Sequence, residues 1–247
     1  MRAMVLGCSS GLGKYLTAHL RSSGWQVAGL SRHPAHDDDV ALDLEAADAP
    51  ERLLRLLQAQ LPDLVVNCAV VYPDLVASQG LGPGEIVREM QRQFVVNAAV
   101  PYAAMDAWIQ TDGPDRACTY VHCSSDSVYA VHPDSAGYPA TKLAAHALVN
   151  ALAKRARGTQ LAVTNLLLGP LATPGKRSEL ERIAAARQWT IERTTELYMS
   201  RANPNYVQDR LIGLDTCAAA VTLLHGLGAQ ANGTLLRLDA GAGGAVV

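Results

Sequence analysis

The sequence predicts an α/β protein with a doubly wound parallel sheet, the Rossmann fold, of about seven strands with helices on both faces. Short apolar runs alternate with helical segments along the whole chain. Such strands, apolar throughout and separated by helices, are typical of a parallel sheet that is covered on both faces. The chain has 247 residues and 49% hydrophobic content, which is enough to bury a full core.

The first half of the chain shows the alternation most clearly. The apolar run 1–7 leads into a helical segment that ends at Gly24, where a left-handed C-cap is expected. Pro50 begins another helical segment, because the first turn of a helix does not need the missing N–H group. We expect strands at 1–7, 25–32, 40–44 and 63–70, and helices at 12–24, 50–61 and 85–110.

The second half repeats the pattern and interrupts it once. We expect strands at 117–124, 161–168 and 234–239, and helices at 136–157 and 215–227. Residues 174–214 break the rhythm, because they are polar and rich in arginine. We therefore expect one dinucleotide-binding and catalytic domain over 1–247, with an insertion at about 174–214 that covers the active site.

Composition argues against several classes of protein. The net charge is −2 and no block of Lys and Arg occurs, so neither a nucleic-acid nor an anionic-membrane surface is expected. No signal peptide and no window long enough to span a membrane is visible, so we expect a soluble, cytoplasmic protein. The five cysteines are odd in number and scattered, as reduced thiols would be. No metal is expected, because Cys118, His122 and Cys123 lack a second ligand pair.

The stretch "GCSSGLGK" joins the first strand to the first helix. Gly7, Gly11 and Gly13 would let the backbone approach a pyrophosphate, and the helix N-terminus would offer free N–H groups. The alternative is a tight turn that only needs positive φ angles. We expect this loop to bind a cofactor through Gly7, Ser9, Ser10, Gly11, Leu12 and Gly13.

The end of the second strand bears on the choice of cofactor. An acidic residue there usually binds the ribose 2′-hydroxyl of NAD, but here Ser31 and Arg32 follow the strand and no acid occurs before Asp37. A guanidinium group suits the 2′-phosphate of NADP through charge-assisted hydrogen bonds. NADP(H) is therefore favoured over NAD(H), with a solvated loop arginine as the alternative.

Tyr138 and Lys142 stand four residues apart in an alanine-rich helical segment. Residues at this spacing share one face of a helix, so the ammonium group can act on the phenol. Taken alone, such a pair is more often a surface contact.

Together with these features, seven motifs in order resemble the short-chain dehydrogenase/reductase family in its compact branch. The motifs are "GCSSGLG", "ALDLE", "VVNCAV", "FVVNAA", "VHCSSDSVYA", "LGPLATP" and "NGTLLRLDAG". Ser125 precedes Tyr138 by thirteen residues, the separation that the compact branch uses. The resemblance adds these residues to the predicted cofactor site: Asp43, Leu44, Asn67, Ala69, Tyr138, Lys142, Gly169, Pro170 and Thr173.

The resemblance also implies a reaction and a role for each catalytic residue. A hydride moves between nicotinamide and the carbon of a carbonyl or hydroxyl group, and Tyr138 donates or accepts the proton. Lys142 favours the phenolate, whose ordinary pKa of about 10 is too high for an efficient base. Ser125 orients the carbonyl oxygen, and Asn97 holds a water that links Lys142 to solvent. The ordinary alternatives are a strand-end cap for Ser125 and a mid-helix polar residue for Asn97.

The sequence departs from the family pattern at several positions. Cys68 and Val70 replace an Asn and a Gly beside the cofactor ribose, and Leu168 and Ala240 replace a common Pro and Gly. The stretches "SSDSVYA" and "PDLVVNCA" also resemble the longer sugar-nucleotide branch, although little chain remains after "RLDAGAGG" for its sugar-binding domain.

We therefore expect a reductase of a ketone or aldehyde, or the reverse alcohol dehydrogenase. The alternatives are an imine or enoyl reductase, an epimerase-like enzyme, and a non-enzymatic protein that senses NADP or acts as a scaffold. The substrate is a small molecule, with Trp189, Tyr198 and Tyr206 expected around an apolar pocket. We expect a homotetramer or homodimer, because helices 85–110 and 136–157 resemble the family's pairing helices.

Overall fold

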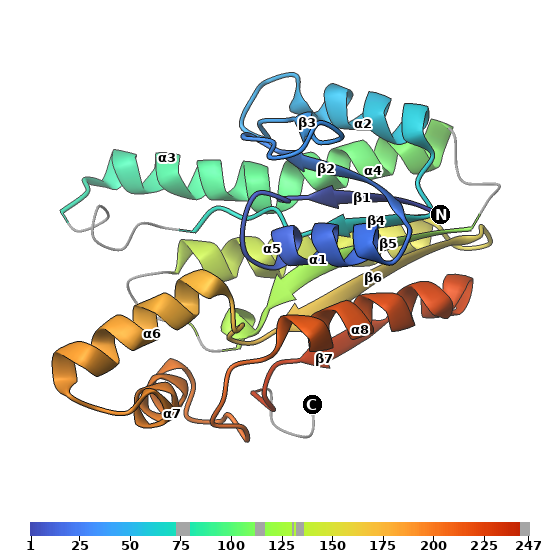
Figure 1. Cartoon of the computed structure of the whole chain (residues 1–247). Coiled ribbons are helices and arrows are strands. Elements are labelled where there is room, and N and C mark those ends of the chain that lie inside the picture. Colours follow the sequence, from blue (N-terminus) through green and yellow to red (C-terminus); the bar gives the residue numbers. More distant parts are fainter. Residues whose placement is uncertain (73–79, 112–116, 130, 132–135, 243–247) are drawn as a thin grey trace.

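The computed structural model describes residues 1–72, 80–111, 117–129, 131 and 136–242. Within this part of the chain, seven parallel strands form one sheet in the order β3-β2-β1-β4-β5-β6-β7 (Figure 1). The strands are β1 (Arg2–Leu6), β2 (Gln26–Ser31), β3 (Val40–Ala41), β4 (Leu64–Asn67), β5 (Cys118–Ser125), β6 (Leu161–Leu168) and β7 (Leu235–Leu238). The predicted doubly wound sheet is confirmed, and its strand order reverses between β1 and β4.

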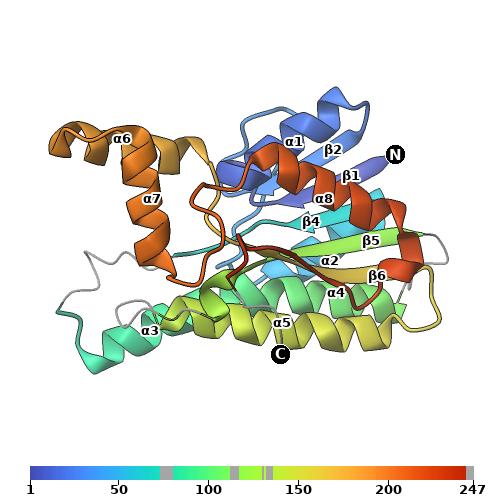
Figure 2. The same cartoon turned by 90° about the horizontal axis from the view of Figure 1, so that it is seen from below.

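Helices cover both faces of this sheet (Figure 2). The helices are α1 (Gly11–Ser22), α2 (Ala49–Gln60), α3 (Pro83–Phe94), α4 (Val100–Thr111), α5 (Gly137–Arg155), α6 (Pro174–Arg187), α7 (Ile191–Ala202) and α8 (Leu214–Gly226). Helices α1 and α8 pack on one face, while α2, α4 and α5 pack on the other. Successive residues of β1 point to opposite faces of the sheet. Val5 packs into the core under α1 and α8, whereas Met4 packs into the core under α2 and α4.

Three segments differ from the sequence-based expectation. The strand expected at 40–44 is only the pair Val40–Ala41, because the chain turns at Leu42–Leu44 to line a cavity. The polar insertion 174–214 contains helices α6 and α7, capped by the hydroxyl groups of Thr173 and Thr190.

The third difference is a π-helical segment, Val95–Ala99, which joins α3 to α4 within the single helix expected at 85–110. Pro101 has no N–H group to give to the carbonyl of Asn97, four residues earlier, so a regular α-helix would lose a hydrogen bond and be kinked at this point. The chain instead makes an i→i+5 bond from Val100 to Val95. The turn therefore places the buried Asn97 side chain at a break in the helix.

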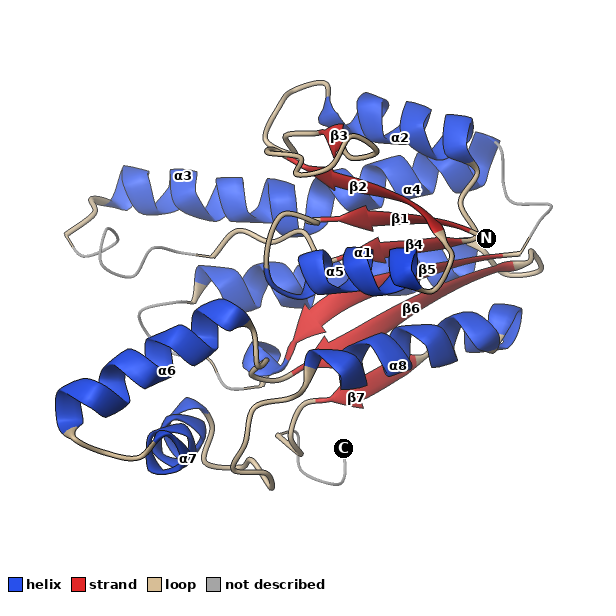
Figure 3. Ribbon diagram, viewed as in Figure 1, coloured by secondary structure: helices blue, strands red, loops and turns tan. Residues whose placement is uncertain are grey.

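All strands point toward the same edge of the sheet, and α6 and α7 lie beyond that edge (Figure 3). Register keeps the strand ends level: Asn67 of β4 pairs with His122 of β5, and Ser125 of β5 pairs with Leu168 of β6. Loops that leave neighbouring parallel strands at this edge converge on one place, which is where ligands bind in open α/β sheets.

Candidate active site

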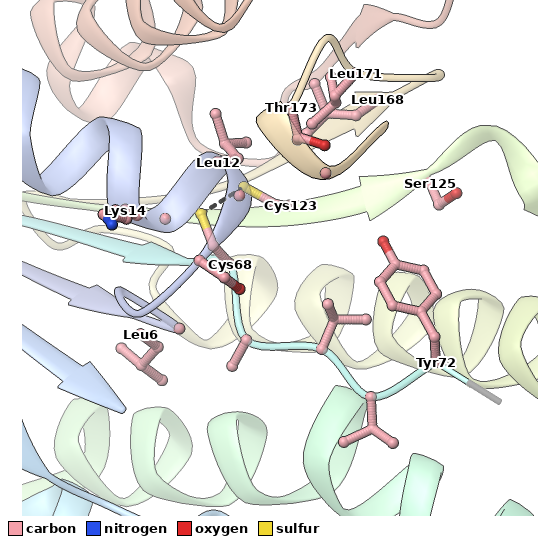
Figure 4. Close-up of a pocket in the computed structure, with 18 of the residues that line it drawn as sticks. Leu6, Leu12, Lys14, Cys68, Tyr72, Cys123, Ser125, Leu168, Leu171 and Thr173 are labelled. Atoms are coloured by element: carbon pink, nitrogen blue, oxygen red, sulfur yellow. Dashed lines mark hydrogen bonds between the residues drawn. The ribbon is translucent and has the colours of Figure 1, made fainter. Parts of the chain in front are cut away.

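A cavity of about 1090 Å³ lies at the carboxyl ends of β1, β2, β4, β5 and β6. It brings together all of the sequence-predicted site residues except Asn67 and Asn97. Figure 4 shows its two ends: Leu12 and Lys14 come from the first helix, whereas Tyr72 and Ser125 stand at the opposite end. The residues predicted from separate motifs therefore share one cavity.

Three positions of the glycine loop favour glycine, two by a close backbone approach and two by a positive φ angle. Gly7 has a φ of +81°, and a Cβ there would lie 2.8 Å from the Ala69 backbone. A Cβ on Gly13 would lie 2.2 Å from the Gly7 carbonyl oxygen, and Gly11 has a φ of +51°. The loop packs tightly against the β4 end and leaves its outer side open to the cavity, so it fits a dinucleotide pyrophosphate at the N-terminus of α1.

Charged side chains lie where the cavity meets the end of β2. Arg32 is 56% exposed, and its guanidinium lies 3.8 Å from the Glu45 carboxylate. Arg92 of α3 makes a closer pair with the same carboxylate, at 2.9 Å. Asp39 faces away from the cavity, because it accepts hydrogen bonds from Arg21 and from the Gly29 N–H group. The acid that pairs with Arg32 is thus Glu45, which the sequence analysis did not identify.

Asn67 lies behind the cavity wall and fixes the chain that leaves β4. Its Oδ1 atom accepts a hydrogen bond from the Ala69 N–H group at 3.1 Å. Its Nδ2 atom lies 3.3 Å from the Tyr120 hydroxyl and 3.2 Å from His122 Nδ1. These contacts hold Ala69 against the glycine loop.

Asn97 also lies behind the wall, where it joins two segments. Its Oδ1 accepts from the Val71 N–H group at 2.7 Å, and its Nδ2 donates to the Val71 carbonyl at 3.0 Å. The same Nδ2 donates to Thr141 Oγ1 at 3.1 Å. The side chain therefore ties the segment after β4 to helix α5. The expected water at Asn97 stays a prediction.

Tyr138 and Lys142 lie on the first two turns of α5 and face the cavity. The Lys142 ammonium is 5.9 Å from the centre of the Tyr138 ring and donates to the Cys123 carbonyl at 2.9 Å. Burial lowers the pKa of Lys142 to about 8. Burial raises the pKa of the Tyr138 phenol well above its ordinary value, and hydrogen bonding to Ser125 opposes that rise.

Ser125 ends β5 and caps the 3-10 turn Asp126–Val128. Its Oγ accepts a hydrogen bond from the Ser127 N–H group at 3.2 Å, so the strand-end cap considered from the sequence is present. The Ser125 hydroxyl proton makes only a long contact, 3.5 Å, with Asp126 Oδ1, so a closer substrate oxygen can take its place. Capping and orientation of a substrate oxygen are therefore compatible roles for Ser125.

Besides Glu45, the polar cavity residues that were not identified from the sequence include Tyr72, Asp126 and Lys176. The Tyr206 hydroxyl donates a hydrogen bond to Asp126, and burial raises the pKa of the Asp126 carboxyl. Lys176 of α6 lies 4.5 Å from the centre of the Tyr198 ring. Asp126 directly follows Ser125 in "SSDS", which is the one signal that could have indicated it.

The expected apolar pocket requires a correction. Tyr198 and Tyr206 line the cavity, but Trp189 does not: its ring packs against the guanidinium groups of Arg187 and Arg193 at the junction of α6 and α7. Asp126 and Lys176 lie beside the two tyrosines, so charged side chains are found among the aromatic and apolar ones in this part of the cavity.

Two cysteines lie at the floor of the cavity. The sulfur atoms of Cys68 and Cys123 are 3.5 Å apart and share a hydrogen bond (Figure 4). This bond and burial raise the pKa of the Cys68 thiol well above its ordinary value. Among the described residues, no group of three His, Cys, Asp or Glu side chains could hold a metal ion. No helix of the described chain is long and apolar enough to cross a bilayer.

The glycine cradle, the Tyr–Lys helix and the serine at one sheet edge define a class: a dinucleotide-binding protein of the doubly wound type. Comparison with known proteins refines this class. The model of the NAD dependent epimerase/dehydratase family matches residues 3–188. The chain therefore belongs to that family, within the short-chain dehydrogenase/reductase superfamily of oxidoreductases.

Individual relatives match nearly the full length. "Uncharacterized oxidoreductase YvaG" of Bacillus subtilis (strain 168) is 27% identical over 97% of this chain and 94% of its own. The ligand-free aldohexose dehydrogenase of Thermoplasma acidophilum has a TM-score of 0.77 at 21% identity, covering 99% of this chain and 94% of that one. A variant actinorhodin polyketide ketoreductase with NADPH has a TM-score of 0.73 at 18% identity, covering 99% and 97%. The predicted membership in the superfamily is confirmed.

Proposed function

We propose that the protein is an NADP-dependent oxidoreductase that transfers a hydride between nicotinamide and the carbonyl or hydroxyl carbon of a small molecule. The observation that carries this proposal is the shared cavity, in which the glycine loop lies at one end and Tyr138, Lys142 and Ser125 at the other. A bound nicotinamide dinucleotide supplies or takes the hydride. The chain's own residues bind it, orient the substrate and move the proton.

Each catalytic residue has a role in this proposal. Tyr138 donates a proton to the substrate oxygen in reduction and accepts it in oxidation. Lys142 favours the phenolate by its positive charge, and Ser125 donates a hydrogen bond to the same oxygen. Asn97 completes the set as the residue that holds the relay water. The cofactor residues are those predicted: Gly7, Ser9, Ser10, Gly11, Leu12, Gly13, Ser31, Arg32, Asp43, Leu44, Asn67, Ala69, Tyr138, Lys142, Gly169, Pro170 and Thr173.

NADP(H) is the favoured cofactor because Arg32 lines the cavity beside the end of β2 and no carboxylate of β2 competes for a ribose hydroxyl. The polyketide ketoreductase in the comparison was solved with NADPH. Glu45 lowers the local positive charge, so the preference is expected to be moderate.

An epimerase-like reaction is the second candidate, favoured by the family model itself and by the Asp126 carboxyl next to Ser125. In such a reaction the cofactor returns to its starting state, so no net oxidation of NADPH occurs. The two candidates thus differ in a directly measurable quantity.

The proposed assembly is one domain over 1–247 with 174–214 as the substrate cover, in a cytoplasmic homodimer or homotetramer. The outward faces of α4 and α5 carry the small, exposed residues Ala103, Ala140 and Ala147 beside the exposed Leu143. Small side chains allow two helices of another copy to approach closely. Light scattering that shows a monomer at micromolar concentration would rule this assembly out.

The function is tested by oxidation of NADPH with a panel of ketones and aldehydes, using wild-type and Tyr138→Phe protein. Tyr138→Phe should lose about 10²–10⁴-fold in turnover while NADPH affinity stays nearly unchanged, because only the proton donor is removed. Wild-type turnover in the variant would refute the assignment of Tyr138. Substrate conversion without net NADPH oxidation would favour the epimerase-like reaction.

A further inference from the structure

Cys68 and Cys123 are the two cysteines that line the cavity. Their sulfur atoms lie 3.5 Å apart and share a hydrogen bond, and Figure 4 shows the two side chains pointing toward each other. The other three cysteines, Cys8, Cys118 and Cys217, are buried and do not line the cavity. A small solute that enters the cavity therefore meets one pair of thiols.

The sheet holds this pair at a spacing that suits a disulfide. Asn67 of β4 pairs with His122 of β5, and the next residue of each strand is a cysteine. The Cys68 N–H group still donates to the Leu6 carbonyl at 3.0 Å, so Cys68 continues the strand. Neighbouring strands lie about 4.8 Å apart, and disulfides form where Cα atoms are about 4.4–6.8 Å apart. Both cysteines pack into the core under α1 and α8, so the sulfur atoms can join with little movement of the strands.

The surroundings give the two thiols different roles. The hydrogen bond to Cys123 and burial raise the pKa of Cys68, so Cys68 keeps its proton. Lys142 donates to the Cys123 carbonyl at 2.9 Å and places a positive charge beside the pair. A thiolate at this site is therefore carried by Cys123, where the ammonium group and the Cys68 S–H group both stabilise it.

We propose that Cys68 and Cys123 form a modification site, at which hydrogen peroxide converts the two thiols into a disulfide. The Cys123 sulfur attacks the peroxide, the O–O bond breaks, and a sulfenic acid and one water are formed. The Cys68 sulfur then attacks the sulfenic sulfur, the S–S bond forms, and the hydroxyl group leaves as water with the Cys68 proton. The dithiol thus loses two electrons and two protons, and the peroxide is reduced to two waters.

The disulfide acts on the cofactor end of the cavity, a consequence that rests on the proposed function. A Cβ on Gly7 would lie 2.9 Å from the Cys68 carbonyl carbon, and one on Gly13 would lie 3.3 Å from the Cys68 Cβ. Drawing the sulfur atoms from 3.5 Å to a bonded separation of about 2 Å therefore displaces the wall on which the glycine loop packs. NADPH should bind about tenfold more weakly to the disulfide form. By linkage, the bound cofactor favours the dithiol by the same factor.

The first test is a peptide map of wild-type protein treated with a slight excess of hydrogen peroxide without cofactor. The product should lose about 2 Da per chain and contain one link, between the peptides of Cys68 and Cys123. Cleavage after Tyr120 separates Cys123 from Cys118, and dithiothreitol should restore the original mass. Cys123→Ser should form no link, whereas Cys118→Ser, the matched control on the same strand, should form it as wild type does. A wild-type map without this link, or with oxidation spread over the other cysteines, overturns the proposal, whether or not the variants fold.

The second test concerns the cofactor. NADPH affinity is measured by nicotinamide fluorescence in the dithiol and disulfide forms, and the redox equilibrium of the pair is measured against dithiothreitol with and without saturating NADP⁺. Both measurements should change by about tenfold in wild type, whereas peroxide treatment of Cys123→Ser should leave its NADPH affinity unchanged. Equal NADPH affinities of the two wild-type forms overturn the effect on the cofactor. A reduced protein that binds no NADP(H) overturns the proposed function instead, and it leaves the peptide map as it is.

Discussion

The cofactor preference depends on two side chains of opposite charge, Arg32 and Glu45. Arg32 is the cation nearest the β2 end of the cavity, and Glu45 lies 3.8 Å from it. Replacing Arg32 with serine removes the group proposed to bind the 2′-phosphate. Replacing Glu45 with glutamine keeps the shape of the side chain and removes the competing negative charge.

The size of each effect follows from the exposure and spacing of these groups. A bidentate contact between a guanidinium and a phosphate contributes about 1.5–3 kcal/mol, or roughly tenfold to a hundredfold in affinity. Arg32 is 56% exposed and shares its charge with Glu45, so we expect the lower limit, about a tenfold loss of NADPH affinity in Arg32→Ser. In Glu45→Gln, repulsion of a phosphate several ångströms away is removed, which should raise NADPH affinity by about threefold.

The assay is direct binding of NADPH and NADH, followed by the fluorescence of the reduced nicotinamide. The quantity compared is the ratio of the two dissociation constants in wild type, Arg32→Ser, Arg32→Asp and Glu45→Gln. Arg32→Asp should move the preference toward NADH, since a carboxylate repels the phosphate and accepts from a free hydroxyl. Arg55→Ser, an exposed arginine of α2 outside the cavity, is the control. If the wild type prefers NADH, or if Arg32→Asp leaves the ratio unmoved, Arg32 is only a surface residue.

Two further predictions concern the glycine loop and Lys142. Gly13→Ala should weaken NADPH binding by about tenfold to a hundredfold, because its Cβ would lie 2.2 Å from the Gly7 carbonyl and displace the loop. Gly226→Ala on α8, outside the cavity and with no atom within 4 Å of the new Cβ, should bind normally. Lys142→Met should abolish turnover but raise stability at pH 7. The lowered pKa of Lys142, about 8, implies a cost of about 3 kcal/mol for the buried charge, and the lost bond to Cys123 offsets about 1 kcal/mol. The net gain of about 2 kcal/mol corresponds to a Tm about 4–8 °C higher. This gain is fully present below pH 8 and fades between pH 8 and 10.5, as the folded wild type loses the proton that the unfolded chain still binds. A variant that is less stable than wild type at pH 7, by calorimetry without cofactor, would contradict the cost assigned to Lys142.

The fold could be predicted from the sequence because each of its signals is local. The apolar runs of β1, β4, β5 and β6 are buried on both faces, so their composition alone distinguishes them from the amphipathic helices between them. The glycine loop is equally local, since the clash of a Cβ at Gly13 depends on a contact only six residues away, with Gly7. The break at Val95–Ala99 could also have been expected, because Pro101 stands four residues after Asn97.

The candidate site was predictable only in part, and the missing residues show why. Ser125, Tyr138 and Lys142 belong to motifs whose spacing is visible along the chain. The contact of Tyr206 with Asp126 joins residues eighty positions apart, and that of Arg92 with Glu45 joins residues forty-seven apart. Trp189 was predicted to line the cavity and does not. Its aromatic ring suggested a pocket, but at the junction of α6 and α7 it packs against two arginines. Long-range placement depends on tertiary packing, which no single motif encodes.

Asn97 was predicted from its motif, but its contacts were not. The sequence motif indicates an asparagine in the middle of a helix, but not what its amide contacts. Its three hydrogen bonds run to residues next to Tyr72 and to Lys142, so one buried side chain sets the spacing between the β4 end and α5. Buried amides that are fully satisfied hold their neighbours in one arrangement, and a partly satisfied one costs stability. In the proposed mechanism, any substitution of Asn97 therefore loosens both the segment after β4 and helix α5, which carries Tyr138 and Lys142, so its effect on turnover should exceed the loss of a single relay water.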